Sequence, residues 1–240
     1  MLIGGLQKTT LIDFPGRVAS TVFTVGCNFR CPFCHNKDLV SLRNFNKSSF
    51  KQISEEEIFQ FLGSRKRILD GVCITGGEPT IQEDLSAFCQ KIKDLGLEVK
   101  IDTNGTKPNI IKKLIKEGLV DFISMDIKTS FENYQVASGV KFNIEKIKES
   151  IKIIVQSKIE CEFRITVVPT IHKKEDLLNL ASQLKKIDDN IFLILQSFQP
   201  KNCLDSKYNK KKPFTSKEMK SLLKTVRKTL HKSKIRGEEA

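Results

Sequence analysis

The chain has 240 residues, 39% of them hydrophobic, and a formal net charge of +13. This length and composition predict a globular protein with one large α/β domain or two small ones. No apolar run approaches the roughly 20 residues that a membrane helix needs. The start of the chain also lacks the pattern of a signal peptide, so we expect a cytoplasmic protein. Its seven cysteines form no paired pattern, which argues against a disulfide framework.

The positive charge is unevenly distributed. Residues 201–240 contain 13 Lys/Arg and 4 Asp/Glu, a net charge of +9, which leaves +4 for residues 1–200. This excess indicates a binding patch for nucleic acid or an acidic protein, or else a solvated Lys-rich tail. Sparse aromatic residues and the lack of a nucleic-acid motif favour the tail and argue against a nucleic-acid partner.

Short β-branched runs alternate with longer amphipathic runs, as in successive βα units. Ser54 and Glu57 form a capping-box pattern at the first predicted helix, and Pro108 suits the first turn of the third. The absence of long linkers indicates one parallel sheet, either doubly wound or an incomplete βα barrel. The predicted strands are 18–25, 71–75, 97–102, 120–127, 159–168 and 191–197, and the predicted helices are 54–69, 82–95, 108–117, 143–157, 173–186 and 215–231.

Unusual polar residues cluster at the carboxyl ends of these predicted strands. In βα barrels and open α/β sheets alike, this edge carries the active site. We therefore expect the cysteine-rich run from Cys27 to Asn36 to belong to an active site. The residues at the strand ends are Cys27, Gly76–Pro79, Asp102–Gly105, Asp126, Lys128, Gln196 and Gln199.

The run CNFRCPFCHN (27–36) is compatible with four kinds of group. A structural zinc site needs four ligands, and a redox pair of Cys31 and Cys34 leaves Cys27 without a role. The haem pattern CxxCH belongs with exported proteins. A four-iron cluster normally takes four thiolates, so three would leave one iron open to a small molecule. The sequence favours this last arrangement.

The spacing CxxxCxxC followed by GGEP (76–79) resembles the radical S-adenosylmethionine superfamily. The run CNFRCPFCHN resembles its glycyl-radical-enzyme activating branch. TTLIDFPGRVASTVFTVGCNFRCPFCHN, GGEPTIQ and LQSFQPKNCLD together most resemble the anaerobic ribonucleoside-triphosphate reductase activating proteins. The resemblance implies a single-domain, incomplete (β/α)6 radical-SAM barrel. Its expected parts are an N-terminal extension (1–17), the barrel core (18–200) and a basic C-terminal helix and tail (201–240).

The same resemblance implies an oxidoreductase that reductively cleaves S-adenosylmethionine at a [4Fe-4S] cluster. The enzyme would then abstract a hydrogen from a glycine of anaerobic ribonucleoside-triphosphate reductase. Its expected partners are that reductase, or another glycyl radical enzyme, and a one-electron donor such as flavodoxin or ferredoxin. The alternatives are an activator of the pyruvate formate-lyase type, a radical SAM enzyme that modifies a small molecule or RNA, and a non-catalytic binding module stabilised by zinc or a cluster.

The resemblance also assigns roles to individual residues. Gly76 and Gly77 would let the backbone approach the cofactor, because they lack a Cβ, and Glu78 would accept from its ammonium group. Asp13, in the DFPG turn, would hold the glycine loop of the partner, unless it only bonds its own backbone. The cluster ligands would be Cys27, Cys31 and Cys34, and the other cofactor contacts would be Phe33 at the adenine, Asp102, Thr103 and Asp126 with an optional monovalent cation, Lys128 and Arg164 at the cofactor carboxylate, and Gln199 at the ribose.

Simpler explanations stay open for several of these residues. Phe33 suits a hydrophobic core, and the charged group from Asp102 to Arg164 suits surface ion pairs. We expect His35 and Asn36 to organise the cysteine loop by hydrogen bonds. Cys73, Cys89 and Cys161 are predicted to be buried small hydrophobic residues.

Overall fold

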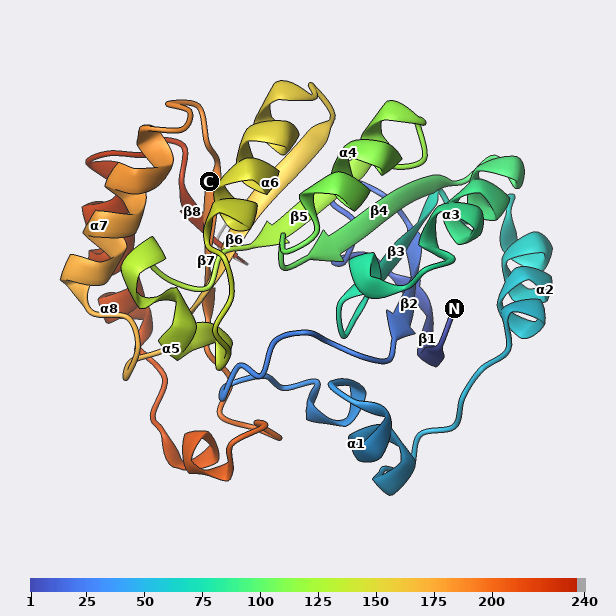
Figure 1. The fold of residues 1–240 in the computed structure, drawn as a ribbon, viewed down its shortest axis with the longest axis horizontal. Coiled ribbons are helices and arrows are strands. Elements are labelled where there is room, and N and C mark those ends of the chain that lie inside the picture. The colour runs from blue at the N-terminus through green and yellow to red at the C-terminus, as the bar shows by residue number, and fades with distance from the viewer. Residues whose placement is uncertain (237–240) are drawn as a thin grey trace.

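The fold is an eight-stranded sheet with helices on its outer face (Figure 1), seen in a computed structural model that describes residues 1–236. The strands follow the order β1 to β8; β1 is antiparallel to β2, and all other neighbours are parallel. No helix in the described part of the chain is both long and apolar enough to span a membrane. The strands are β1 (Ile3–Thr10), β2 (Ala19–Thr24), β3 (Gly71–Gly76), β4 (Glu98–Thr103), β5 (Phe122–Asp126), β6 (Glu160–Val167), β7 (Leu193–Ser197) and β8 (Lys234–Ile235).

The six predicted strands are confirmed as β2 to β7, and each predicted helix is present. Ser54 Oγ accepts from Glu57 N at 3.1 Å, and the Glu57 carboxylate accepts from Ser54 N at 3.0 Å. These two hydrogen bonds confirm the predicted capping box. Pro108 begins α4 as expected. The α-helices are α1 (Leu42–Lys47), α2 (Glu55–Arg65), α3 (Leu85–Asp94), α4 (Pro108–Lys116), α5 (Tyr134–Ser138), α6 (Glu145–Gln156), α7 (Lys174–Lys185) and α8 (Ser216–Arg227).

Two strands and two α-helices were not predicted: the edge strands β1 and β8 and the short helices α1 and α5. The six-strand prediction was therefore incomplete. β1 lies inside the expected N-terminal extension, and its sequence IGGLQKTT has two adjacent glycines, which weaken the local strand signal. β1 forms because it pairs with β2, which compensates for the weak strand tendency of the local sequence. The pairing runs from Ile3 opposite Thr24 to Thr10 opposite Ala19.

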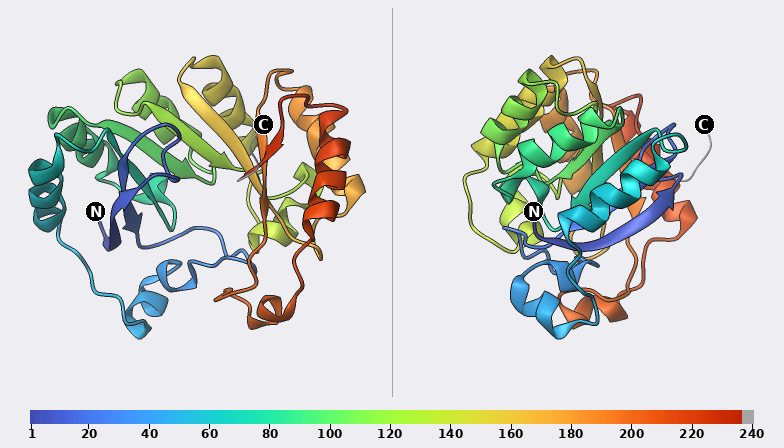
Figure 2. Two further views of the ribbon diagram at one scale, coloured as in Figure 1. Left: turned by 180° about the vertical axis from the view of Figure 1, so that it is seen from behind. Right: turned by 90° about the vertical axis from the view of Figure 1, so that its right-hand side faces the viewer.

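The sheet curves into an incomplete barrel (Figure 2). Its two ends are β1 and β8, which are not neighbours in the strand order, so the predicted open (β/α)6 architecture is confirmed. Side chains of alternate residues face opposite sides of a strand. On β3 the outward residues Val72 and Ile74 join the main hydrophobic core, together with Phe88 and Ile92 of α3.

The inner face of the barrel is polar in its middle and apolar at the amino ends of the strands. The turn after β1 places Phe14 against Gly71 and against Phe122, with ring centroids 5.9 Å apart. Phe14, Ala19 and Phe122 form a small separate core. This core closes the amino end of the barrel, so the polar interior is reached from the carboxyl ends and from the open side.

Candidate active site

A cavity of about 390 Å³ lies inside the barrel, toward the carboxyl ends of the strands. All but one of the predicted site residues line it, which brings together positions from Asp13 to Arg164. The exception is Gln199, whose side chain is exposed; Gln196, on β7, lines the cavity instead. The predicted residues that line the cavity are Asp13, Cys27, Cys31, Phe33, Cys34, Gly76, Gly77, Glu78, Asp102, Thr103, Asp126, Lys128 and Arg164.

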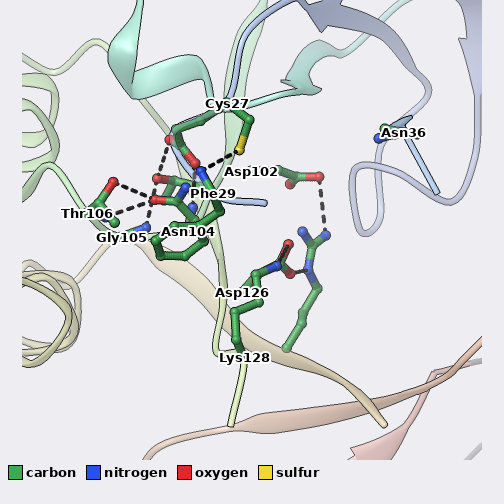
Figure 3. A network of polar contacts seen from close by, with 12 residues as sticks. Cys27, Phe29, Asn36, Asp102, Asn104, Gly105, Thr106, Asp126 and Lys128 are labelled. Carbon is green, nitrogen blue, oxygen red and sulfur yellow. Dashed lines mark hydrogen bonds and ion pairs between the residues drawn. The ribbon is translucent and has the colours of Figure 1, made fainter. Parts of the chain in front are cut away.

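The cysteine loop begins where β2 ends and is held by backbone hydrogen bonds. Cys27 N donates to Val40 O at 2.9 Å, and Arg30 N donates to Ser138 O at 2.8 Å, at the end of α5. The Arg30 guanidinium donates to the carbonyls of Cys27 and Phe29. Figure 3 shows Cys27 Sγ beside the backbone N–H of Phe29, at 3.3 Å. These contacts fix the loop before any ligand binds.

The three thiols share the cavity, but no group of three His, Cys, Asp or Glu side chains in residues 1–236 converges on a single-ion position. Burial raises the pKa of the Cys27 thiol to about 11, and the nearby Glu78 carboxylate adds to this shift. Burial likewise raises the pKa of Cys31 to about 12. A positive group that binds the thiolates is needed to deprotonate them at neutral pH.

Glu78 joins the loop after β3 to the loop after β4. Its Oε1 accepts from Thr103 Oγ1 at 2.7 Å and from both the N–H and the hydroxyl of Thr80, and its Oε2 accepts from Asn104 N at 2.6 Å. The side chain is fully buried, and burial raises its pKa. Four donors already occupy this carboxylate, so Glu78 organises the two loops in addition to facing the cavity.

A network of amide and hydroxyl groups ties the cysteine loop to the loop after β4 (Figure 3). Asn104 Nδ2 donates to Asn28 Oδ1 at 2.8 Å, and Asn28 Nδ2 lies 2.6 Å from Thr106 Oγ1. Thr106 also donates to Asn104 Oδ1. Sequence reasoning singled out neither Asn28 nor Thr106, although both lie within or directly after the motifs that it quoted.

The inner face also carries a buried network of charges. Arg164 Nε donates to Asp126 Oδ1 at 2.8 Å, and Arg164 Nη1 lies 3.3 Å from Asp102 Oδ2. Lys100 pairs with Asp102, and Lys128 Nζ lies 3.4 Å from Asp126 Oδ2. The alternative of surface ion pairs is wrong for Arg164, which is only 8% exposed, whereas Asp102, Asp126 and Lys128 are half-buried at the cavity.

The charges in this network set each other's ionisation. Burial opposes the charged form of Asp126, but Arg164 and Lys128 outweigh it and lower the pKa of that carboxyl. Burial opposes the charge of Lys128 in the same way, and Asp126 raises its pKa. Asp126 and Lys128 therefore stay charged at neutral pH, and Lys128 presents an ammonium to the cavity.

His172 contacts the backbone carbonyl of Lys128, and the sequence did not predict this contact. His172 Nδ1 accepts from Val168 N at 2.8 Å, and His172 Nε2 lies 2.7 Å from Lys128 O. Because Nδ1 accepts, Nε2 carries the proton and donates to the carbonyl. Burial lowers the pKa of His172 to about 4, so the ring is neutral at physiological pH.

Gly76 and Gly77 are required by the packing of the protein itself. Gly76 has φ +106°, and a Cβ there would meet the backbone of Thr24. A Cβ at Gly77 would overlap the carbonyl of Gly26, directly before Cys27. The GGEP loop therefore packs against the start of the cysteine loop, a contact that the sequence-based explanation did not include.

Asp13 lies at the opposite end of β2 from Cys27. The turn after β1 carries it, and Thr21 Oγ1 donates to Asp13 Oδ2 at 2.7 Å. Its carboxylate is thus bonded to a β2 side chain and not to its own turn. Asp13 nevertheless lines the cavity, which extends through the barrel from this residue to the cysteines.

The remaining cysteines and Phe33 mostly agree with expectation. Cys73 and Cys89 are fully buried, but Cys161 is only half-buried, so that prediction was wrong. Phe33 is buried and lines the cavity, 6.5 Å from the ring of Tyr208 between centroids. The cavity also includes Thr75 and Thr166, which lie on inward-facing strand positions that only the fold identifies.

Comparison with known proteins identifies the class. The family described as the radical SAM superfamily matches residues 21–184. The structure of Streptococcus suis SuiB bound to S-adenosylmethionine superposes with a TM-score of 0.66 at 15% identity. That match covers 90% of this chain and 49% of SuiB, so it supports the fold alone. The chain belongs to the radical SAM superfamily.

Two relatives indicate which group within the superfamily the chain belongs to. A Methanocaldococcus jannaschii protein named "Putative glycyl-radical enzyme activating enzyme" is 32% identical over 98% of this chain and 95% of its own length. The pyruvate formate-lyase-activating enzyme of Clostridium pasteurianum is 28% identical over 77% of this chain and 76% of its own length. The chain is thus a radical SAM enzyme of the glycyl-radical-enzyme activating group. Membership implies a [4Fe-4S] cluster and S-adenosylmethionine as cofactors.

Proposed function

We propose that this protein activates an anaerobic ribonucleoside-triphosphate reductase by removing a hydrogen atom from one of its glycines. The observation that carries the proposal is one continuous cavity, with the three thiols at one end of β2 and Asp13 at the other. The run LQSFQPKNCLD also supports it: Leu204 N and Asp205 N donate to the carbonyls of Cys34 and Pro32, at 3.0 and 2.9 Å. A segment on which the resemblance to these activators rests thus holds the cysteine loop.

The donor set fits a four-iron cluster held by three cysteines. Cys27, Cys31 and Cys34 supply three sulfur ligands from one ordered loop that lines a single cavity, and thiolates are the ligands of a four-iron cluster. When bound, the cluster supplies one electron for the reductive cleavage of S-adenosylmethionine. We assign these three side chains as its ligands.

The residues around the thiols are suited to bind a zwitterionic cofactor. Lys128 offers an ammonium that can pair with a carboxylate, and Glu78 Oε2 can accept from an ammonium group in addition to Asn104 N. Phe33 offers a buried aromatic face for the adenine. Lys100, Arg164 and Lys128 already balance Asp102 and Asp126, so a monovalent cation is not needed to neutralise them.

Asp13 is suited to hold the main chain of the partner. A glycine loop that leaves its own fold gives up backbone hydrogen bonds and needs replacements. Among the described residues, Thr21 bonds one oxygen of the Asp13 carboxylate, and the other can accept a backbone N–H. The barrel is open between β1 and β8, which gives such a loop a lateral entrance.

The test uses anaerobically reconstituted protein, a chemical reductant and a purified anaerobic reductase, with electron paramagnetic resonance to count glycyl radicals. The parent should form the radical, and Asp13→Ala should keep cluster content and cofactor cleavage while losing it. Thr21→Val, which removes only the hydroxyl donor, should retain most of the yield. Full radical yield from Asp13→Ala would show that this carboxylate serves only the fold, through its contact with Thr21.

Activation of a pyruvate formate-lyase-type enzyme is the second candidate, because the Clostridium pasteurianum activator aligns over three quarters of both chains. The same assay with pyruvate formate-lyase separates the two: a radical on that enzyme but not on the reductase would replace our assignment. We propose that either reaction takes place in the cytoplasm, where both enzymes would meet their electron donor.

A further inference from the structure

The outer edge of β1 has little of the protection that strands at the end of a sheet normally carry. Such edges are usually shielded by several charges, a proline or a covering segment. β1 has eight residues, IGGLQKTT, with Lys8 as its one charged residue and no proline. Among residues 1–236, the bridge between Ile3 and Ile53 is the one backbone pairing on its outer side. The rest of the edge therefore leaves main-chain groups available to another strand.

β1 also connects the two ends of the active site. It is antiparallel to β2, with Ile3 opposite Thr24 at the cysteine end and Thr10 opposite Ala19 at the end that carries Asp13. Figure 2 shows β1, in dark blue, at one end of the curved sheet. An extended segment paired with β1 would therefore lie along the open side of the barrel, between the two ends of the active-site cavity.

A mainly apolar cavity of about 340 Å³ lies against β1. Phe23 lines it and is paired in the sheet with Thr75, which lines the active-site cavity, so this second cavity is on the inner side of the barrel. Leu39 and Phe50 add further apolar lining. Asp38 is the one charged residue that lines it. The cavity thus fits an uncharged apolar side chain.

Gly5 lies opposite Phe23 and lines this cavity, and the packing of the chain does not require a glycine there. A Cβ at Gly5 would make only an ordinary contact with Phe23, at 3.5 Å, and its φ is not in the left-handed region. At the adjacent Gly4, by contrast, a Cβ would come within 2.8 Å of Val25 and two other side chains. A strand glycine often marks a place where another backbone approaches closely. A large side chain of a neighbouring strand can then pack across it.

This cavity adjoins the active site, because His35 and Asn36, the two residues after Cys34, line both cavities. We propose that the glycine-bearing segment of the partner binds as an added strand on β1, with a large apolar side chain in the cavity opposite Gly5. Its main chain pairs with residues 5–7, the stretch between the two register shifts of β1 against β2. This inference rests on the proposed function, because it takes the substrate to be a segment of a protein.

Two other occupants fit the edge less well. A second copy of this chain would offer its own β1, whose inner-side residues opposite Phe23 and Thr21 are Gly5 and Gln7. Neither fills an apolar cavity, and Leu6 packs against the main core on the outer side. An acidic segment would bring a second negative charge close to the Asp38 carboxylate.

The first experiment measures binding by calorimetry. The probe is a short synthetic peptide copied from the glycine-bearing segment of the reductase, added to the anaerobically reconstituted enzyme. Gly5→Val places methyl groups in the cavity and should weaken binding at least about tenfold, because a large apolar side chain loses its site. Unchanged affinity of Gly5→Val would overturn the proposal.

Gly63→Val is the matched control for the same change in side chain. Gly63 lies in α2, and nothing approaches its Cβ position within 4 Å. Its affinity for the peptide should equal that of the parent. The iron content and thermal unfolding midpoint of both variants show whether each has kept the fold. Equal weakening by Gly5→Val and Gly63→Val would overturn the proposal.

The second experiment uses the parent enzyme and two N-methylated forms of the peptide, so it does not depend on how a variant folds. Successive N–H groups of a strand point to opposite sides. Methylation of one alternating set of amides should therefore abolish binding, whereas methylation of the other set should leave it intact. Equal effects of the two sets would show that the peptide does not bind as a strand and would overturn the proposal.

The remaining outcomes concern the identity of the occupant. A dimer of the parent in analytical ultracentrifugation that Gly5→Val converts to a monomer would assign the edge to a second copy and overturn the proposal. Strand-like binding of a pyruvate formate-lyase peptide, with no radical on the reductase, would support strand addition although the proposed function fails. Binding of neither peptide would overturn strand addition even if the reductase is activated.

Discussion

The guanidinium of Arg164, on β6, donates to the carboxylate of Asp126, on β5, at 2.8 Å, and the two residues are directly paired in the sheet. The same guanidinium reaches Asp102 on β4. One side chain thus holds two carboxylates across three adjacent strands. Since the three belong to the wall of the cavity, the network fixes the shape of the site as well as its charge.

Removing Arg164 should destabilise the fold strongly. Arg164→Met would leave two half-buried carboxylates short of a partner. Breaking a fully buried charge pair from one side costs roughly 3–5 kcal/mol, so we expect a loss of about 3 kcal/mol or less here. Urea unfolding of the cluster-free protein measures this loss. Arg164→Lys, which keeps the charge but loses the planar fork, should recover only part of it. An unfolding midpoint that does not move in Arg164→Met would show that the network contributes nothing to stability.

Cluster binding should depend on the three loop cysteines alone. Cys31→Ala should abolish the iron and sulfide content, which is expected to be about four of each per chain in the parent. Cys89→Ala is the matched control, because Cys89 is fully buried in α3 and does not line the cavity. Iron analysis and the visible absorption spectrum report the difference. Stoichiometric zinc without a cluster spectrum in the parent would contradict the assignment.

Adding a methyl group at Gly77 should disturb the cysteine loop itself. A Cβ there overlaps the Gly26 carbonyl, so Gly77→Ala should lower cluster retention and cofactor affinity together. Gly63→Ala is the control: it lies within α2, and nothing approaches its Cβ position within 4 Å. That change should raise stability by about 0.5–1 kcal/mol. Normal cluster content with weakened cofactor affinity in Gly77→Ala would instead favour a direct approach of the backbone to the cofactor.

Acid should destabilise the protein through His172. Its pKa is about 4 in the folded state, against an ordinary value of 6.5. Between these values the unfolded chain binds the proton and the folded chain does not, so stability is lost as pH falls from about 6.5 toward 4. The loss from this group should reach about 3 kcal/mol, at roughly 1.4 kcal/mol per unit of pKa shift.

His172→Gln tests that pH dependence by removing the titrating ring. Its unfolding free energy should be lower than that of the parent at pH 7 and should fall less steeply between pH 6.5 and 4. Chemical denaturation at several pH values supplies both numbers. Parallel curves for parent and variant would show that other groups cause the acid sensitivity.

Much of the fold was predictable because local sequence and final structure agree. Strands β2 to β7 are β-branched runs buried on both faces, and helix signals at Ser54 and Pro108 act locally. β1 was not predictable in this way, since its adjacent glycines become a strand only through pairing with β2.

The sequence motifs predicted most of the site residues. The incorrect or missing predictions concern features that motifs do not encode. Gln196 and Gln199 lie near the carboxyl end of the last long strand, but only Gln196 is part of β7 and lines the cavity, whereas Gln199 lies beyond the strand and is exposed. The contacts of Asn28 and His172 join segments that are distant in sequence, so no local sequence pattern predicts them.

The open barrel leaves two sheet edges, β1 and β8, where local opening of the fold should begin. β1 and β8 end the sheet, and β8 is only two residues long, so apart from the bridge between Ile3 and Ile53 their outer edges have no neighbouring strand. Hydrogen–deuterium exchange should accordingly begin at these two strands and reach β4 and β5 last. The residues that hold Asp102 and Asp126 would then be the slowest-exchanging part of the chain, while the side of the barrel offered to a partner opens many times before the protein unfolds.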